Sequence, residues 1–177
     1  MSLRVGRDAV VDELRAMAHP TRLRILSLLT GAALTAADVA RELDLTHANA
    51  SYHLRQLRAA GTIQVAGEER IRGGIAKRYR YDPDRESAAT SPGTAGRRAV
   101  FLAYAAELRR RSAHLRDGPG HTHGTDAELW VDPATWTAFR AQIMEASRAL
   151  HRAAQAPRTA GTIRTNTTIA LFEMDPQ

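Results

Sequence analysis

MAHPTRLRILSLLTGAALTAADVARELDLTHANASYHLRQLRAAG, residues 17–61 of the chain, is the stretch from which the fold can be predicted. Apolar side chains recur along it at helical spacing, and Pro20, Thr35 and Thr46 stand where helices commonly begin. Proline suits the first turn of a helix, and a threonine hydroxyl can cap a free backbone N–H group there. The pattern predicts three successive helices, the last two joined by a tight turn. We expect one further helix before them, over about residues 8–19.

The third of these helices, over residues 46–60, has an apolar inner face and a polar outer face. Ala50, Leu54 and Leu57 form the inner stripe. A helix that lies in the major groove of DNA needs such an inner stripe, with polar side chains turned toward the bases and phosphates. The alternative reading of the same pattern is an ordinary solvated helix face. The outer residues, our candidate DNA contacts, are His47, Asn49, Ser51, Tyr52, His53, Arg55 and Gln56.

Beyond this helix the apolar spacing changes to that of strands. Ile63 and Val65 alternate with polar neighbours, a stretch rich in Gly and Arg follows, and Tyr79 and Tyr81 alternate in AKRYRY. We predict a two-stranded hairpin whose basic part, the wing, spans residues 67–81. Phosphate groups are natural partners for its cations, although a charged edge can also simply protect a hairpin from aggregation. The candidate phosphate contacts are Arg70, Arg72, Lys77, Arg78 and Arg80.

These segments together resemble the ArsR-type winged-helix transcriptional repressors of bacteria and archaea. The resemblance runs from about Met17 to Tyr81 and rests on AMAHPTRLRILSLL, ASYHLRQLRAAG and the hairpin end KRYRY. Ser51, His53 and Leu54 fill the family's recurring pattern of Ser, any residue, His and Leu in the reading helix. The resemblance implies a winged helix-turn-helix fold and homodimers that bind imperfect palindromes. The groove-facing set that it implies, to which we add Thr46, is His47, Ala48, Asn49, Ser51, Tyr52 and His53.

The second half of the chain looks like a separate helical module. Residues 84–96 hold too few apolar side chains to join a core, so we predict a linker there. Helices are expected over about residues 97–116 and 133–155, the second after an Asp132 cap. Their wide apolar stripes favour dimerisation through these helices together with the N-terminal helix. The alternative is that the stripes pack within one subunit.

Short strands are expected in this module as well, at residues 129–131 and in the Thr-rich segment that contains Ile163, Ile169 and Leu171. The expected fold class is therefore α+β, mostly α: a winged helix-turn-helix domain over residues 1–83, the linker, and a module for dimerisation or ligand sensing over residues 97–177.

Composition narrows the functional classes. The chain has 25 Lys and Arg against 19 Asp and Glu and a pI near 10.6, so it should be attracted to polyanions. Cysteine is absent, which excludes disulfides, thiolate metal sites and thiol redox sensing. No apolar stretch approaches the roughly 20 residues of a membrane-spanning helix, and we see no signal-peptide core. We expect a cytoplasmic, nucleoid-associated protein without a membrane partner.

Catalytic and metal-binding patterns find no support. There is no phosphate loop, nucleophile elbow or HExxH zinc helix, so we expect no enzyme and no cofactor. One His-rich stretch contains His114, Asp117, His121, His123 and Asp126. Imidazoles there could hold zinc or nickel, but the spacing matches no metal-sensor signature, and a solvated loop without metal is the prediction.

The sequence thus predicts a sequence-specific DNA-binding regulator, a homodimeric repressor that binds an imperfect palindromic operator through helix 46–60 and wing 67–81. Its partners would be double-stranded DNA and a second copy of itself. A small-molecule effector, if there is one, would act through the C-terminal module. The alternatives are a winged-helix protein-interaction module, or a small-molecule-binding protein without specific DNA readout.

Overall fold

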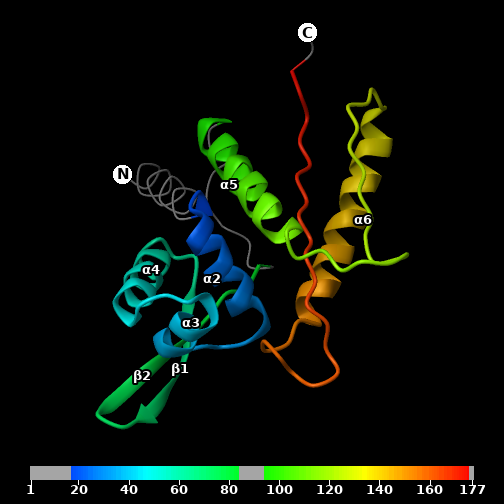
Figure 1. Cartoon of the computed structure of the whole chain (residues 1–177). Helices are drawn as coiled ribbons and strands as arrows, with labels where there is room; N and C mark the ends of the chain where they lie inside the picture. Colours follow the sequence, from blue (N-terminus) through cyan, green and yellow to red (C-terminus); the bar gives the residue numbers. More distant parts are fainter. Residues whose placement is uncertain (1–16, 84–93, 176–177) are drawn as a thin grey trace, which may run out of the picture.

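Three helices, a hairpin and a helical C-terminal region follow one another in the computed structural model, which describes residues 17–83 and 94–175 (Figure 1). The expected helix over residues 8–19 lies almost wholly outside the described residues, as does most of the expected linker. The fold is a winged helix-turn-helix followed by a helical region, mixed α+β and mostly helical, as predicted. Its elements are α2 (Pro20–Gly31), α3 (Ala36–Leu43), α4 (His47–Ala59), β1 (Gln64–Ile71), β2 (Gly74–Arg80), α5 (Thr94–Ser112) and α6 (Pro133–Arg152).

Side-chain caps set the helix starts where the sequence predicted them. Thr35 and Asp38 form a reciprocal capping box on α3, in which each side chain accepts a hydrogen bond from the backbone N–H of the other. Burial raises the pKa of the Asp38 carboxyl, but hydrogen bonds from Thr35 and Arg41 outweigh it and leave that pKa lowered. Thr46 Oγ1 accepts from the Asn49 N–H at 3.2 Å and caps α4. The start of α4 is therefore fixed by its own sequence.

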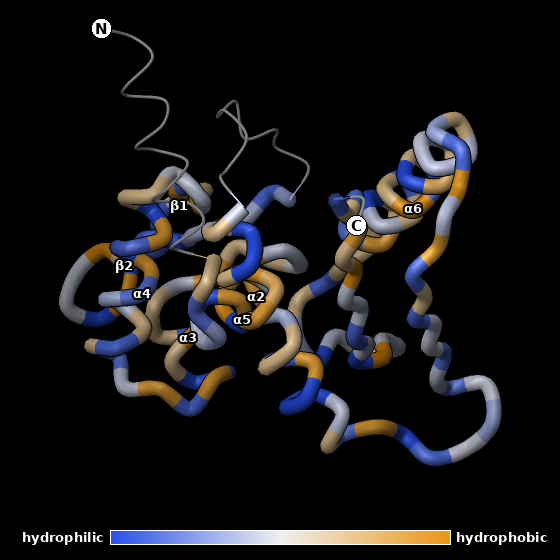
Figure 2. The backbone as a smooth tube through the Cα atoms, turned by 90° about the horizontal axis from the view of Figure 1, so that it is seen from above, coloured by the Kyte–Doolittle hydropathy of each residue, from blue (hydrophilic) through white to orange (hydrophobic). Residues whose placement is uncertain are grey.

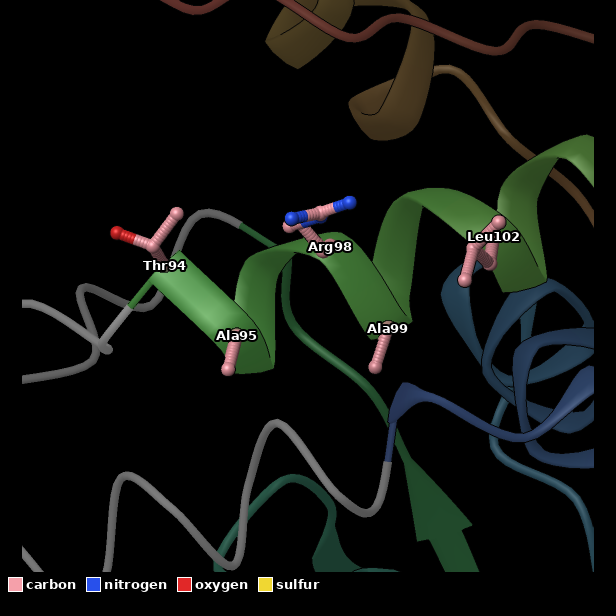
Figure 3. Close-up of a pocket in the computed structure, with 5 residues that line it drawn as sticks. All are labelled: Thr94, Ala95, Arg98, Ala99 and Leu102. Atoms are coloured by element: carbon pink, nitrogen blue, oxygen red, sulfur yellow. The ribbon is translucent and has the colours of Figure 1, made fainter.

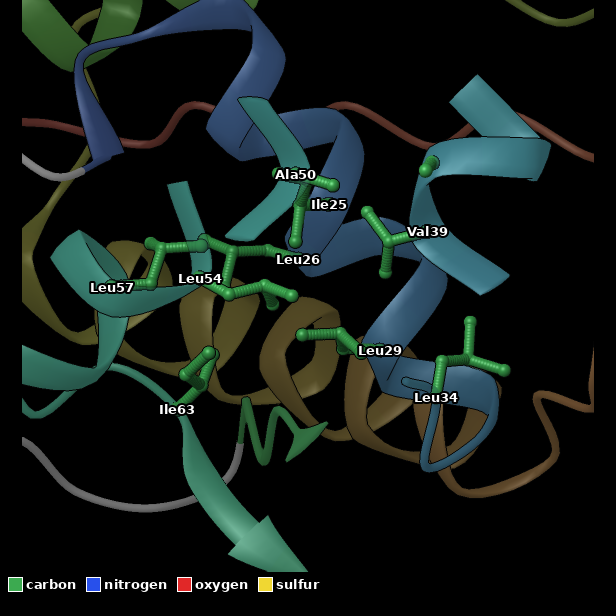
Figure 4. Packing of buried hydrophobic residues seen from close by; sticks show 10 residues of the cluster. Ile25, Leu26, Leu29, Leu34, Val39, Ala50, Leu54, Leu57 and Ile63 are labelled. Carbon is green, nitrogen blue, oxygen red and sulfur yellow. The ribbon is translucent and has the colours of Figure 1, made fainter. Parts of the chain in front are cut away.

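The core of the N-terminal part lies among α2, α3 and α4 (Figure 4). Ile25 and Leu29 of α2 meet Val39 of α3 and Leu54 and Leu57 of α4, and all five are fully buried. Burying such side chains contributes roughly 1.5–3 kcal/mol each, enough to hold short helices that would be marginal alone. The inner stripe predicted for α4 is confirmed.

The hairpin is attached to this core by its backbone. Tyr79 and Leu34 exchange two backbone hydrogen bonds, of 2.8 and 3.0 Å, and Tyr81 donates its backbone N–H to the Leu29 carbonyl at 3.2 Å. The strands pair antiparallel with one irregularity between Val65 and Gly67. Gly73 takes a φ of 96° at the tip, which a residue with a Cβ would adopt only with strain. The root of the wing is thus fixed to α2 and to the segment before α3.

The C-terminal region is built differently, because its two helices pack on α2 more than on each other. Val100 and Ala103 of α5 are buried, whereas α6 buries no residue. The turn after α6 approaches the last residue of α2 so closely that a Cβ on Gly31 would lie 2.3 Å from the Gln155 carbonyl oxygen. Seen from above, α2 and α5 lie between α4 with the hairpin on one side and α6 with the C-terminus on the other (Figure 2).

Two expectations for this region were wrong in detail. Residues 129–131 and 163–171 are extended but form no strand, since the only sheet of the described residues is the β1–β2 hairpin. Strand propensity requires a neighbouring strand to be realised, and no other segment of the described chain supplies one. The helices also begin and end somewhat differently: α5 begins before residue 97, and both helices end earlier than predicted. Within the described residues, no helix is long and apolar enough to cross a membrane.

Candidate nucleic-acid interface

The outer face of α4 carries most of the predicted DNA contacts in exposed positions. Its N-terminal end is open to solvent, and Tyr52 keeps 47% of its surface exposed one turn later. Ser51 is half-buried. The face offers amide, imidazole, phenol and guanidinium groups from a single helix, the mixture that can meet base edges and phosphates. The exposed members of the predicted set are Thr46, His47, Ala48, Asn49, Tyr52, Arg55 and Gln56.

His53 has a different environment from its neighbours on α4. Its ring is half-buried, 5.1 Å from the ring of His19 at the start of α2 and edge-on to Tyr52. Its Nδ1 is buried and has no hydrogen-bond partner among the described residues. Burial lowers the pKa of His53, and the nearby charges of His19 and Arg22 lower it further. His53 therefore packs α4 against α2, and a base contact by this side chain would require its ring to leave His19.

The wing cations also separate into two kinds. Arg78 turns back to the domain: its Nε and Nη2 donate to the Ala33 carbonyl at 3.1 and 2.6 Å, and its Nη1 pairs with Glu69 at 2.9 Å. It joins the wing to the segment before α3, a role that the alternation of charges did not reveal. The other predicted phosphate contacts are exposed: Arg70, Arg72, Lys77 and Arg80.

Two features of the wing were missed by the sequence reasoning. Glu68 lies opposite Lys77 and Glu69 pairs with Arg78, so two carboxylates on β1 offset part of the positive charge. Ile71 and Ile75 flank the turn with 49% and 65% of their surfaces exposed, where no core exists to cover them. Apolar side chains at the tip of a basic wing are suited to contact sugars or base edges in a minor groove. Their signal in the sequence was an apolar pair beside the Gly-Gly turn.

No metal centre is formed by the described residues. No three His, Asp or Glu side chains of that part of the chain come together, and His121 and His123 stay in an exposed loop. A hollow of about 410 Å³ runs along the first turns of α5, where Ala95 and Ala99 point to one side and Arg98 to the other (Figure 3). This hollow is an open surface on one helix.

Comparison with known proteins locates the functional domain. A family model described as a helix-turn-helix domain matches residues 17–63. The chain carries a helix-turn-helix domain. The match covers α2, α3 and α4 and stops where the wing begins. Helix-turn-helix domains of this kind occur in ArsR-type regulators and are typically not catalytic. No curated protein matches the chain. The domain indicates a DNA-binding regulator.

Proposed function

We propose that the chain is an ArsR-like transcriptional repressor that binds an imperfect palindrome as a homodimer, through α4 and the wing. The observation that carries this proposal is the division of α4 into a fully buried inner stripe and an exposed polar outer face, beside a hairpin with exposed cations. Figures 1 and 2 both place α4 and the hairpin on the side of the molecule away from α6. Among the described residues, α6 and the segment after it therefore leave that side uncovered.

The bases would be read from the outer face of α4. Asn49 and Gln56 carry amides that can pair with adenine, and Arg55 can contact guanine or a phosphate. Each good bidentate contact contributes roughly 1–3 kcal/mol of discrimination against the wrong base pair. Tyr52 offers a phenol and an apolar ring at the same level. The operator sequence follows from which of these side chains reaches a base edge.

The wing would add affinity without sequence preference. If three of Arg70, Arg72, Lys77 and Arg80 neutralise phosphates, the slope of log affinity against log salt steepens by about three units. Arg78 is excluded from this count because its donors already serve Ala33 and Glu69. The wing root fixed by Tyr79 holds these cations at a set distance from α4.

A homodimer would double this reading surface. Two copies of α4 related by a two-fold axis meet successive major grooves about 34 Å apart, so the two half-sites form a near-palindrome. Occupying such a site over a promoter excludes the transcription machinery, which is the simplest basis for repression. The exposed apolar side chains of the C-terminal region would form the dimer interface. An effector, if one acts, would do so by changing that contact.

The decisive experiment selects fragments of genomic DNA with the purified full-length chain and footprints the bound fragments. We expect protection of two similar half-sites about 10 base pairs apart, centre to centre. Protection of one unrepeated half-site would contradict the dimeric form. Equal affinity for unrelated sequences at moderate salt, or no mobility shift at all, would overturn the proposal and favour a protein-interaction module.

Matched variants separate base reading from phosphate binding. Asn49→Ala should change sequence preference, whereas Arg72→Ala should weaken all sequences alike and reduce the salt slope by about one unit. Arg109→Ala removes the same charge from an exposed position on α5, away from α4 and the hairpin, and should leave both properties unchanged. A salt slope reduced equally by Arg72→Ala and Arg109→Ala would mean that net charge, and not the wing, drives binding.

A further inference from the structure

The segment of residues 163–172, here called the tail, has the composition of a strand but no strand partner. Its sequence IRTNTTIALF places Ile163, Ile169 and Leu171 on one side of an extended chain, with Arg164 on the other. No backbone hydrogen bond joins residues 163–175 to the rest of the described chain. A row of free N–H and C=O groups on an apolar, extended segment is a template for pairing with another strand.

Side chains hold the tail in position although its backbone is unpaired. Arg111 of α5 donates Nη1 to Asn166 Oδ1 at 3.0 Å, and Phe172 stacks on Phe101 of α5 at 5.3 Å. Just beyond the tail, Trp136 of α6 donates its indole N–H to Glu173 at 2.9 Å. Figure 1 accordingly shows the tail running extended between α5 and α6. Side chains of the same chain thus hold the tail in place, but its backbone N–H and C=O groups have no hydrogen-bond partners among the described residues.

Many apolar side chains of the tail, of α6 and of residues 129–131 are exposed to solvent. Trp130 and Ile163 are 88% and 78% exposed, and α6, a helix of 20 residues, buries none of them. With about 150–250 Å² for a large side chain, the exposed apolar side chains of residues 129–174 present an area on the order of 1,000 Å². A stable protein interface buries about 800 Å² on each partner.

Two of the usual protections of a free strand edge are missing from the tail, proline and several charges. Natural sheets shield such edges with proline, several charges or a covering helix, and the tail contains no proline and only Arg164 as a charged residue. A second copy of the chain brings the same segment, and a two-fold axis across it pairs the two antiparallel. The apolar side of one tail then continues into the apolar side of the other.

We propose that the tail is an intermolecular β-strand, completed by edge-to-edge pairing with a second copy of this chain. The inference rests on the homodimer of the proposed function and names the segment that builds it. The paired tails form a small sheet across the two-fold axis, and the apolar side chains of α6 and of residues 129–131 are covered as the two C-terminal regions meet. The dimer contact thus lies on the side of the chain away from α4.

The first test combines sedimentation with hydrogen exchange on the full-length chain over a range of concentrations. In the dimer, the amides of residues 163–172 should be protected, and dilution to the monomer should restore exchange at the rate of an open chain. A chain that sediments as a monomer throughout overturns the proposal. So does a dimer whose tail amides exchange freely, or a monomer whose tail amides stay protected because the tail docks within its own subunit.

A matched pair of substitutions tests the backbone pairing itself. Neighbouring N–H groups of a strand point to opposite edges, and proline is tolerated where the lost N–H faces solvent. Of Thr167→Pro and Thr168→Pro, one should therefore raise the dissociation constant of the dimer at least about tenfold more than the other, a difference of about 1.4 kcal/mol. Equal effects of the two variants overturn the proposal. Unfolding of the helix-turn-helix domain, followed separately, should be the same in both.

Failure of this inference is distinguishable from failure of the proposed function. A dimer with a protected tail that shifts no DNA keeps the tail pairing and removes the DNA-binding role. A chain that binds a specific site but sediments as a monomer keeps the DNA reading and removes the tail pairing. Loss of palindrome binding in the disruptive proline variant, with single half-site binding intact, connects the two.

Discussion

The two halves of the described chain contain similar amounts of helix but bury very different amounts of apolar surface. Of the apolar residues that are buried in the described part of the chain, only Val100 and Ala103 lie after residue 63, and both belong to α5, which packs on α2. The N-terminal part closes a core with side chains that come from one subunit. The C-terminal part places aromatic and aliphatic side chains along α6 without covering them. A helix can therefore be well formed locally and still leave its apolar side chains exposed in the single chain.

The largest test of this contrast is one substitution made in both halves. Leu54→Ala empties a fully buried site and should lower the free energy of unfolding by about 2–5 kcal/mol. Leu150→Ala removes a side chain that is 45% exposed, so in the dilute monomer it should cost less than about 1 kcal/mol. Urea unfolding below the concentration of dimer formation measures both. Equal losses would contradict the contrast between a closed and an open half.

Gly31→Ala tests the place where the halves touch. Glycine to alanine at a helical position ordinarily gains about 0.5–1 kcal/mol. Here the new Cβ would lie 2.3 Å from the Gln155 carbonyl oxygen, so we expect a loss of about 1–3 kcal/mol instead. Gly124→Ala, where nothing lies within 4 Å of the added Cβ, is the control and should be neutral. A stabilised Gly31→Ala variant would show that the contact is not maintained in solution.

Arg78→Ala and Arg80→Ala separate the attachment of the wing to the domain from the binding of phosphate groups by the wing. Loss of the Arg78 hydrogen bonds to Ala33 and of its ion pair should cost about 1–2 kcal/mol of unfolding free energy. Arg80 is exposed, so its removal should change stability by less than about 0.5 kcal/mol. DNA titrations over salt should instead show a slope smaller by about one unit for Arg80→Ala. A loss of stability in Arg80→Ala together with a reduced salt slope in Arg78→Ala would contradict these roles of the two residues.

The smallest effect concerns pH. The folded pKa of His53 lies below its ordinary value of 6.5, so the unfolded chain takes up the proton first as the pH falls. His53 should therefore make stability fall on acidification below about 6.5, by at most about 1.4 kcal/mol per pH unit. Unfolding curves of His53→Gln should show a flatter pH dependence than those of His123→Gln, an exposed control. Identical pH slopes would exclude this contribution.

The helix-turn-helix could be predicted from the sequence because its determinants are local. Thr35, Thr46 and Asp132 cap the helices that they were expected to cap, and the inner stripe of α4 is buried as its spacing indicated. Two parts of the candidate site depend on contacts between residues far apart in the sequence, and these were not predicted. His53 meets His19 of another helix, and Arg78 meets Ala33 across a chain separation that no pattern encodes. The prediction of strands in the C-terminal region was wrong for a related reason, because strand propensity alone does not supply a neighbouring strand to pair with.

The close approach of Gly31 to Gln155 connects the end of α2 directly to the turn after α6. The last turn of α2 that ends in Gly31 also holds the wing, because Leu29 accepts the backbone N–H of Tyr81 at the exit of β2. Arg158, three residues after Gln155, reaches Glu42 at the end of α3 at 3.2 Å. The atoms of Gln155 that lie nearest to Gly31 are backbone atoms, so this contact cannot adjust by rotation of a side chain. The turn after α6 is thus tied to the ends of α2 and α3, the same part of the chain that holds the root of the wing.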